Sequence, residues 1–336
     1  MTARRIAQAF ALLLGAGVIL WILIGLPYKG YPGDAVELVV PRGTAPAEVA
    51  RLLGEAGVIR SPLIFRIQAK LMGRSERLQA GEYRFEGPIS TGEALRRITE
   101  GNVILHRVTF PEGLAGREVI DRLVELGLAS REELSEAFTE TGPVEDLDPS
   151  AADLEGYLFP DTYHFARSTP ARQILGAMVR RFREELGDGI GSSARRLGLS
   201  VREVVTMASL VEKETSLDRE RGRVSAVFHN RLRLRMPLQC DPTVIYALAA
   251  DGRYSGSLSR ADLAYDSPYN TYVNPGLPPG PIAAPGRASL EAAVHPDDTD
   301  DLYFVADGSG GHTFSRSLED HVRAVERYRR LGRRGT

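Results

Sequence analysis

The sequence predicts an α+β fold that follows an N-terminal transmembrane helix. Three observations support this prediction. An uncharged apolar run opens the chain at residues 6–27, strand-like runs alternate with amphipathic helix patterns over residues 35–138, and longer helix patterns separated by loops continue to about residue 330. The 336 residues suffice for two ordinary domains, each with its own core.

The apolar run reads IAQAFALLLGAGVILWILIGLP and contains no charged residue. It matches the roughly 20 residues that a helix needs to cross a bilayer. Arg4 and Arg5 precede it, so the positive-inside rule places the N-terminus in the cytoplasm and the rest of the chain outside. A cleaved signal peptide is the alternative, but the run exceeds a normal signal-peptide core and no A-x-A site closes it. We expect a single-pass protein of the inner (cytoplasmic) membrane.

The overall composition excludes several classes of function. The chain has 42 Lys+Arg against 44 Asp+Glu, a formal net charge of -2, so no basic field predicts a nucleic-acid partner. Cys240 is the single cysteine, and no Cys/His cluster has the spacing of a zinc site. No G-x-x-x-x-G-K-[ST] motif is present. The sequence predicts neither a metal nor a cofactor.

A weak internal repeat relates two segments of the chain. Residues 41–57, PRGTAPAEVARLLGEAG, align without gaps on residues 111–127, PEGLAGREVIDRLVELG. Each copy follows a strand-like run and precedes a second helix pattern that starts after Ser61 or Ser130, so two β-α-α units are predicted. Such a unit resembles the LysM-type fold that binds cell-wall N-acetyl sugars. Helix capping and apolar periodicity alone could also produce the similarity, which leaves sugar binding by either copy open.

Helix patterns continue through the second half of the chain. We expect helices at about 170–186 and 192–197, and a further helix that begins at Val201. That last start is fixed by Ser200 and Glu203, which form an S-x-x-E capping box.

The helix from Val201 ends in ASLVEKET and carries two glutamates. At 100° per residue, Glu212 falls near the middle of the apolar stripe, so it should point into the interior or a cleft floor. Glu214 lies away from the stripe and should face solvent or a neighbouring loop. Burial raises the pKa of a carboxyl group, and a carboxyl that stays protonated near pH 7 can act as a general acid. The alternative is a structural ion pair between Glu212 and Arg231 or Arg233.

The segments after this helix are rich in turn residues and aromatic rings. In QCDPTVIYAL, Asp241 should cap a helix whose first turn contains Pro242. The stretch YDSPYNTYVNPGLPPGPIAAPG combines three tyrosines and two asparagines with several prolines. Such a stiffened loop can hold rings and amides in fixed positions that suit a sugar. A surface loop pinned by its own tyrosines is the alternative.

Five ordered motifs closely resemble the YceG-like family of membrane-anchored endolytic murein transglycosylases. They are LEGYLFPDTY, ASLVEKET, RVSAVFHNRLRLRMPLQCDPTVIYAL, SPYNTY and GLPPGPIAAPG. The resemblance implies a cytoplasmic tail at 1–5, an anchor at 6–28, a LysM-like domain at 35–104 and a mixed α+β catalytic domain at 105–330. It further implies peptidoglycan glycan strands as substrate and peptidoglycan synthases as partners.

The resemblance also implies the chemistry. The family cleaves the β-1,4 bond between N-acetylmuramic acid and N-acetylglucosamine and leaves a 1,6-anhydromuramic end, and its catalytic glutamate corresponds to Glu212. At Cys240 the family pattern leads us to expect a small polar residue, so the role of that position is in doubt. The residues expected to orient sugar and acetamide groups are Glu214, Gln239, Asp241, Thr243, Tyr246, Asn270 and Tyr272.

Two functions from other classes remain as alternatives. A noncatalytic protein that binds the wall would use the two repeats to hold glycan and would keep Glu212 in a salt bridge. A peptidase is disfavoured, because the chain has neither a G-x-S-x-G elbow nor an H-E-x-x-H motif.

Overall fold

The computed structural model describes residues 25–332 and, ahead of them, residues 8, 10–12, 14–15, 17–19 and 22. Within this part of the chain, no helix is both long enough and apolar enough to cross a membrane. The span predicted at residues 6–28 falls partly outside the described residues, so it stays a prediction.

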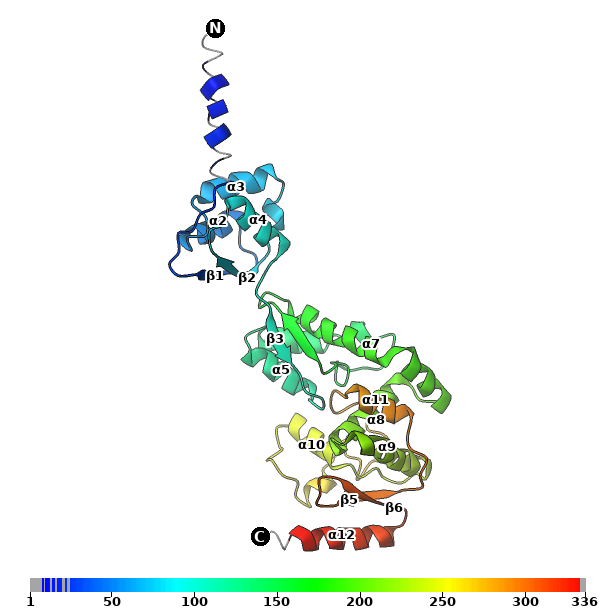
Figure 1. The fold of residues 1–336 in the computed structure, drawn as a ribbon. Helices are drawn as coiled ribbons and strands as arrows, with labels where there is room; N and C mark the ends of the chain where they lie inside the picture. The colour runs from blue at the N-terminus through cyan, green and yellow to red at the C-terminus, as the bar shows by residue number, and fades with distance from the viewer. Residues whose placement is uncertain are drawn as a thin grey trace. The chain divides into compact units, whose positions relative to one another are not determined.

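The chain forms two compact units, which are described separately below. The first comprises Met1–Arg107 and His164–Thr169, and the second comprises Val108–Tyr163 and Pro170–Thr336. The mixture of helices and small antiparallel sheets confirms the predicted α+β class for the folded part of the chain (Figure 1).

The first unit contains a two-stranded sheet and three helices. Strands β1 (Ala35–Val40) and β2 (Gly81–Glu86) pair antiparallel, with Ala35 opposite Glu86 and Val40 opposite Gly81. Between and after these strands lie α2 (Pro46–Glu55), α3 (Pro62–Leu71), a short 3-10 turn (Ser75–Arg77) and α4 (Thr91–Glu100).

Alternation along the strands and amphipathic helices build the core of this unit. Leu38 and Val40 on β1 are buried, as are Tyr83 and Phe85 on β2, because alternate strand residues face the same side. Leu53, Phe65, Leu95 and Ile98 complete this core from the three helices. Each such side chain contributes about 1.5–3 kcal/mol through burial.

The second unit begins with the second copy of the repeat. Strands β3 (His106–Thr109) and β4 (Thr162–Phe165), each of which has residues in both units, pair with each other. Helices α5 (Gly116–Glu125) and α6 (Arg131–Phe138) follow β3, and a 3-10 turn (Gly142–Val144) comes next. The order β-α-α therefore occurs at both copies of the repeat, as the sequence predicted.

Helix α7 (Ala171–Leu197) is interrupted at Gly187, whose φ of 48° and ψ of -179° are not helical. Glycine tolerates this backbone conformation because it has no Cβ. The break divides α7 close to the boundary between the two helices that were predicted at 170–186 and 192–197.

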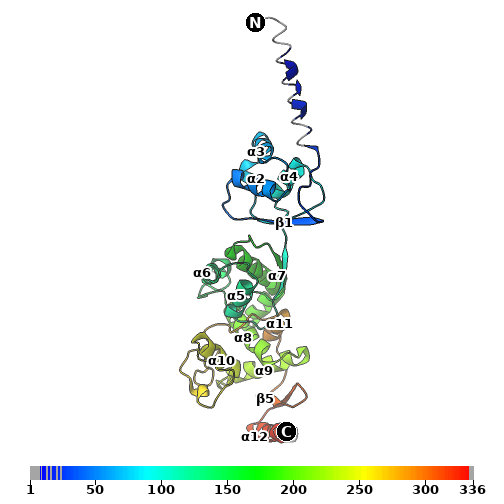
Figure 2. The ribbon, with the colours of Figure 1, turned by 90° about the vertical axis from the view of Figure 1, so that its left-hand side faces the viewer.

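A group of helices forms the centre of the second unit. Helix α8 (Val201–Glu214) packs against α9 (Asp218–Arg233), α10 (Asp241–Ala250) and α11 (Arg287–Val294) (Figure 2). The long loop between α10 and α11 contains a 3-10 turn at Asp262–Ala264.

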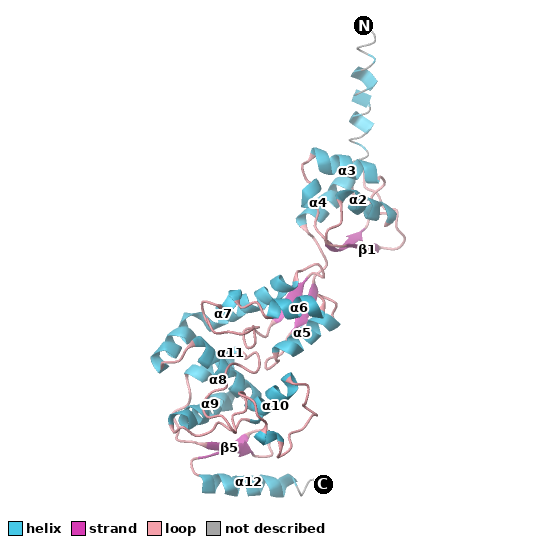
Figure 3. Ribbon diagram, turned by 180° about the vertical axis from the view of Figure 1, so that it is seen from behind, coloured by secondary structure: helices cyan, strands magenta, loops and turns pink. Residues whose placement is uncertain are grey.

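A β-hairpin and a helix complete the unit. Strands β5 (Tyr303–Ala306) and β6 (His312–Ser315) pair antiparallel, and α12 (Leu318–Gly332) packs against this hairpin (Figure 3). Helix α9 also contacts β5, so the hairpin is held close to the group of helices.

Candidate active site

Helix α8 carries both glutamates in its last turn. Its start is the predicted capping box: the Ser200 side chain accepts a hydrogen bond from the Glu203 amide, and the Glu203 carboxylate accepts one from the Ser200 amide. Every residue from Val204 to Val211 is buried. The buried turns therefore fix the helix, and its C-terminal end brings Glu212 and Glu214 to two different environments.

Glu212 is part of a buried ion pair. Its side chain and that of Arg221 on α9 are each 6% exposed, and Arg221 Nη1 lies 3.1 Å from Glu212 Oε1. The other oxygen, Oε2, accepts a hydrogen bond of 3.0 Å from the Gly286 amide. Glu212 is thus buried, as its place on the stripe predicted. The proposed ion-pair partners Arg231 and Arg233 were wrong, because the first turns of α9 bring Arg221 beside the end of α8 instead.

Arg221 holds several groups together around this pair. It also donates hydrogen bonds to the Ser289 hydroxyl and to Asp218 Oδ1, and its guanidinium lies 3.5 Å from Glu112. Both oxygens of Glu212 are therefore occupied by protein donors. This arrangement is typical of a carboxylate that connects helices, and the side chain is only 6% exposed.

Glu214 instead lines a cavity of about 300 Å³. This volume is at the lower end of the range for small-molecule sites. The polar lining is Glu214, Arg231, Gln239, Asp241, Tyr272, His312 and His321, and the apolar lining is Leu238, Phe304, Val305 and Ala306. Four of the seven residues that were predicted to contact substrate meet here, namely Glu214, Gln239, Asp241 and Tyr272. The expectation that Glu214 faces solvent or a loop was incomplete, since the hairpin and α9 form walls around it.

The cavity changes the acidity of Glu214. The pKa of its carboxyl is raised to about 7: burial is the largest cause and the nearby Asp241 acts in the same direction, whereas the Cys240 thiol, His312 and Arg231 oppose the rise. A large share of Glu214 is therefore protonated near neutral pH, which is the state that a general acid requires.

The segment before α10 is held in an unusual backbone conformation. Gln239 has a φ of 50°, in the left-handed region that residues other than glycine rarely adopt. Its amide donates to the Thr271 carbonyl (3.1 Å), and the Cys240 amide donates to the Thr271 hydroxyl (3.0 Å). Such strain occurs most often at functional sites. Here it accompanies a glutamine that lines the cavity.

Asp241 and Tyr272 form a pair within the cavity lining. The Tyr272 hydroxyl donates to Asp241 Oδ1 at 2.5 Å, and burial raises the pKa of Tyr272. Asp241 was predicted to cap α10, but Cys240 occupies the cap position and Asp241 is the first residue of the helix. Its carboxylate is consequently available to Tyr272 and to the cavity.

Thr243 and Asn270 lie behind the cavity lining, although both were expected to contact substrate. Thr243 is fully buried and its hydroxyl donates to the Cys240 carbonyl at 2.7 Å. Asn270 is also fully buried, donates to two loop carbonyls, and accepts a hydrogen bond of 2.9 Å from the Tyr272 amide. Both residues support their neighbours, Cys240 and Tyr272, and neither lines the cavity.

Tyr246 also points elsewhere. Its hydroxyl donates to Glu155 Oε2 at 3.3 Å, and both Glu155 oxygens accept from the Gly116 amide at 3.0 Å. Burial raises the pKa of Glu155 to about 7. The sequence did not identify Glu155 as a titratable residue of interest, although it lies in the motif LEGYLFPDTY.

The sequence also missed His312, which lines the cavity from β6. His312 Nδ1 lies 2.8 Å from Glu220 Oε2, and the His312 amide donates to Glu220 Oε1 at 3.2 Å. Glu220 also packs closely against Gly311, where a Cβ would lie 2.6 Å from Glu220 Oε1. Glu220 therefore fixes the imidazole of His312 in the wall beside Glu214. The available signal was the strand-turn-strand pattern FVADGSGGHTF, which does not indicate which helix the hairpin meets.

Comparisons with known proteins show which family this chain resembles. The model of the YceG-like family matches residues 38–327. An endolytic murein transglycosylase of Bacillus subtilis is 33% identical over 309 residues, which cover 87% of this chain and 84% of that protein. Another from Streptococcus pneumoniae is 32% identical over 333 residues, which cover 89% of this chain and 59% of that protein.

A solved structure is similar over most of its length. A crystal structure of a yceG-like protein from Listeria monocytogenes has 30% sequence identity and a TM-score of 0.59, and the match covers 86% of this chain and 98% of that one. The family match and the two relatives each span well over two thirds of this chain. The chain therefore belongs to the YceG-like family.

Proposed function

We propose that this protein is a peptidoglycan lytic transglycosylase in which Glu214, rather than Glu212, is the general acid and base. The observation that carries the assignment is the position of Glu214 in a polar cavity that raises the pKa of its carboxyl to about 7. The names of the similar proteins from Bacillus subtilis and Streptococcus pneumoniae support murein as the substrate. The ion pair of Glu212 with Arg221 argues against the earlier assignment of Glu212.

One carboxyl group suffices for the reaction that we propose. Protonated Glu214 donates its proton to the glycosidic oxygen, and the bond between that oxygen and C1 of N-acetylmuramic acid breaks. The Glu214 carboxylate then removes the proton from the 6-hydroxyl of the same sugar, whose oxygen forms a new bond to C1. The intramolecular nucleophile gains a high effective molarity, and Glu214 ends in its starting protonation state.

The neighbours of Glu214 suit the binding of sugar groups. Gln239 offers an amide and Asp241 a carboxylate, and Tyr272 adds a ring with a hydroxyl group. We propose that these three bind sugar hydroxyl and acetamide groups, while Thr243 and Asn270 hold them in place. Tyr246 does not line the cavity, and its hydroxyl hydrogen-bonds to Glu155 instead.

Hydrolysis is the second candidate reaction, because the cavity contains a second carboxylate. Most glycoside hydrolases use two such groups, and Asp241 could activate a water molecule while Glu214 protonates the leaving oxygen. The remaining alternative is a protein that binds the cell wall and catalyses no reaction.

Weighing the products tests these three functions together. Purified peptidoglycan should be digested with the full chain in detergent, and the soluble fragments analysed by mass spectrometry. Muropeptides that are lighter by one water than the hydrolysed form support the transglycosylase. Fragments with a reducing end would show instead that the protein is a hydrolase. If no soluble fragments appear, only the noncatalytic wall-binding function is left.

The rate should depend on pH through Glu214. Because the pKa of Glu214 is about 7, the cleavage rate should fall as the pH rises through about 7. His312→Asn removes a group whose charge lowers that pKa, so the midpoint of the fall should move to higher pH. The measurement is kcat/KM on soluble glycan strands across pH. The control is His229→Asn, since His229 contacts the Ala293 carbonyl instead and should leave the midpoint unchanged. A midpoint that stays fixed in His312→Asn would rule out an action of His312 on Glu214.

We also propose the membrane placement that the sequence predicts, with residues 6–28 as a single-pass anchor of the inner membrane and peptidoglycan synthases as partners. Protease added to cells with a permeabilised outer envelope should then degrade the chain beyond residue 30, while a cytoplasmic marker protein stays intact. Complete protection of the chain beyond residue 30 would contradict this orientation.

A further inference from the structure

We propose that the outer face of α3 in the first unit docks on a membrane surface that contains anionic lipid headgroups. This surface, called the α3 face below, consists of exposed apolar residues on α3 and the basic residues around them. The proposal goes beyond the proposed reaction, since it does not concern the cavity around Glu214, and it rests on the membrane anchor proposed above at residues 6–28.

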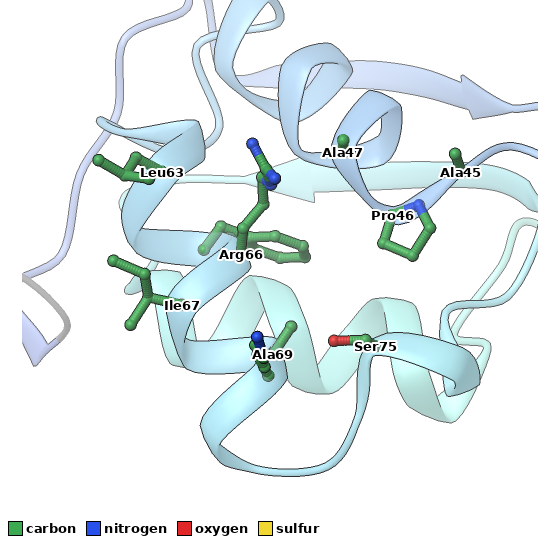
Figure 4. A pocket seen from close by; sticks show the side chains of 10 residues that line it. Ala45, Pro46, Ala47, Leu63, Arg66, Ile67, Ala69 and Ser75 are labelled. Atoms are coloured by element: carbon green, nitrogen blue, oxygen red, sulfur yellow. The ribbon is translucent and has the colours of Figure 1, made fainter.

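The apolar part of the α3 face is a stripe along the helix. Leu63, Ile67 and Leu71 are spaced four residues apart, which places them on one side of the helix. They are 62%, 37% and 76% exposed, and Met72, which follows, is 51% exposed. Figure 4 shows that Leu63 and Ile67 lie on the same side of α3. Exposed apolar residues in such a group indicate a contact surface.

An apolar groove continues this stripe. It has a volume of about 390 Å³, and Leu63 and Ile67 line it together with Pro46 and Ala47 from the start of α2 (Figure 4). The groove has few hydrogen-bonding groups in its lining apart from Arg66, Lys70 and Ser75. It suits an apolar group between cations better than a sugar.

The basic part of the α3 face consists of Arg60, Arg66, Lys70, Arg74 and Arg77. Across residues 60–77 only Glu76 is acidic. Among the described residues, none of these five cations forms an ion pair with a carboxylate. The other helices of the unit differ, because Arg51 on α2 pairs with Glu48 and Glu55, and Arg96 on α4 pairs with Glu93 and Glu100.

This contrast determines the chemistry of the partner. Five cations that pair with no carboxylate of the described chain accompany an exposed apolar stripe, so the complementary surface is anionic at its border and apolar beneath. An interfacial helix that inserts its apolar side between anionic headgroups has this pattern.

The path of the chain before α3 brings this face close to the membrane. The Tyr28 amide donates to the Ile89 carbonyl, and the Gly30 amide donates to the Gly57 carbonyl, both at 2.8 Å. The Arg60 guanidinium lies 5.2 Å from the centroid of the Tyr28 ring. The residues at the end of the predicted anchor and directly after it are thus attached beside the start of α3, a helix only about 15 Å long. If residues 6–28 span the bilayer, the α3 face lies within reach of the headgroups.

A fluorescent label in the full chain tests the proposal. Cys240 is buried, so an added cysteine can be labelled selectively with a nitrobenzoxadiazole dye. The label at Leu71→Cys reports on the α3 face, and the label at Glu37→Cys on β1 is the control in the same unit. Both proteins are reconstituted in phosphatidylcholine vesicles with and without phosphatidylglycerol, and brominated lipids serve as quenchers.

We expect the label at position 71 to be quenched in vesicles with phosphatidylglycerol, much less in pure phosphatidylcholine or at high salt, and the label at 37 to remain unquenched. Arg66→Gln with Lys70→Gln should reduce the docked fraction, since each basic residue near an anionic surface contributes about a fivefold factor. The matched control is Arg51→Gln with Arg96→Gln, which removes two cations from the same unit and should have no effect.

Three outcomes would overturn the proposal. The first is a label at position 71 that is no more quenched than the label at 37 in protein that floats with the vesicles. Protein that does not float at all would contradict the anchor as well as the docking, so flotation is measured separately. The second is quenching that is equal with and without phosphatidylglycerol, which would leave no role for anionic headgroups. The third is a response at position 71 to soluble glycan strands but not to lipid, which would assign the α3 face to wall sugars. None of these outcomes changes the muropeptide products, so failure here is distinct from failure of the proposed function.

Discussion

Replacing Glu214 by glutamine should lower the rate of glycan cleavage by about 10²–10⁴-fold, the contribution typical of general acid–base catalysis. Glutamine keeps the shape of the side chain and part of its hydrogen bonding, but it cannot donate a proton to the glycosidic oxygen or accept one from the 6-hydroxyl. The substitution removes a carboxyl whose pKa burial raises to about 7, so it should not reduce the melting temperature. The measurement is the release of soluble muropeptides from purified peptidoglycan.

Glu212→Gln is the matched control, because the two residues lie in the same turn of α8. We expect this variant to retain cleavage per folded molecule. If Glu212→Gln were inactive while folded and Glu214→Gln were active, the assignment from the sequence would be right and our proposal wrong. An unchanged rate in both variants would remove the two glutamates from the chemistry altogether.

The extent of α8 could be predicted from the sequence because the signals that define its start and its apolar face are local. Ser200 and Glu203 define its start, and the apolar periodicity correctly placed Glu212 on the buried side. Which side chains the buried face of α8 contacts depends on the position of α9, which supplies Arg221. A helical pattern cannot distinguish a carboxylate that faces a cation from one that faces a cavity.

The cavity around Glu214 could not be predicted for a related reason. Its walls come from the end of α8, from α9, from the start of α10 and from the β5–β6 hairpin. Glu220 and His312 are 92 residues apart, and Glu220 also packs closely against Gly311. Among the residues taken from the motifs, Gln239, Asp241 and Tyr272 reach the cavity, whereas the side chains of Thr243 and Asn270 turn back toward the backbone. Composition identified the right loop but could not give the direction of each side chain.

The second large effect that we expect is a loss of stability when the ion pair between Glu212 and Arg221 is broken. Removing one member of a buried ion pair leaves the other charge buried without its partner, which costs about 3–5 kcal/mol. Because Asp218 and Glu112 also lie close to Arg221, we expect about 3 kcal/mol for Glu212→Gln. Arg221→Met should cost a similar amount, since it leaves the buried Glu212 carboxylate with only the Gly286 amide.

A double-mutant cycle identifies the source of this effect. The free energy of unfolding, measured in urea, should fall less in the double variant than the sum of the two single losses, because the pair is lost only once. The exposed pair of Asp121 on α5 and Arg131 on α6 is the control, and substitutions there should cost about 0–1 kcal/mol. Additive losses at Glu212 and Arg221 would mean that the two residues stabilise the unit independently. A stable Glu212→Gln variant that has lost its activity would contradict the purely structural role that we assign to Glu212.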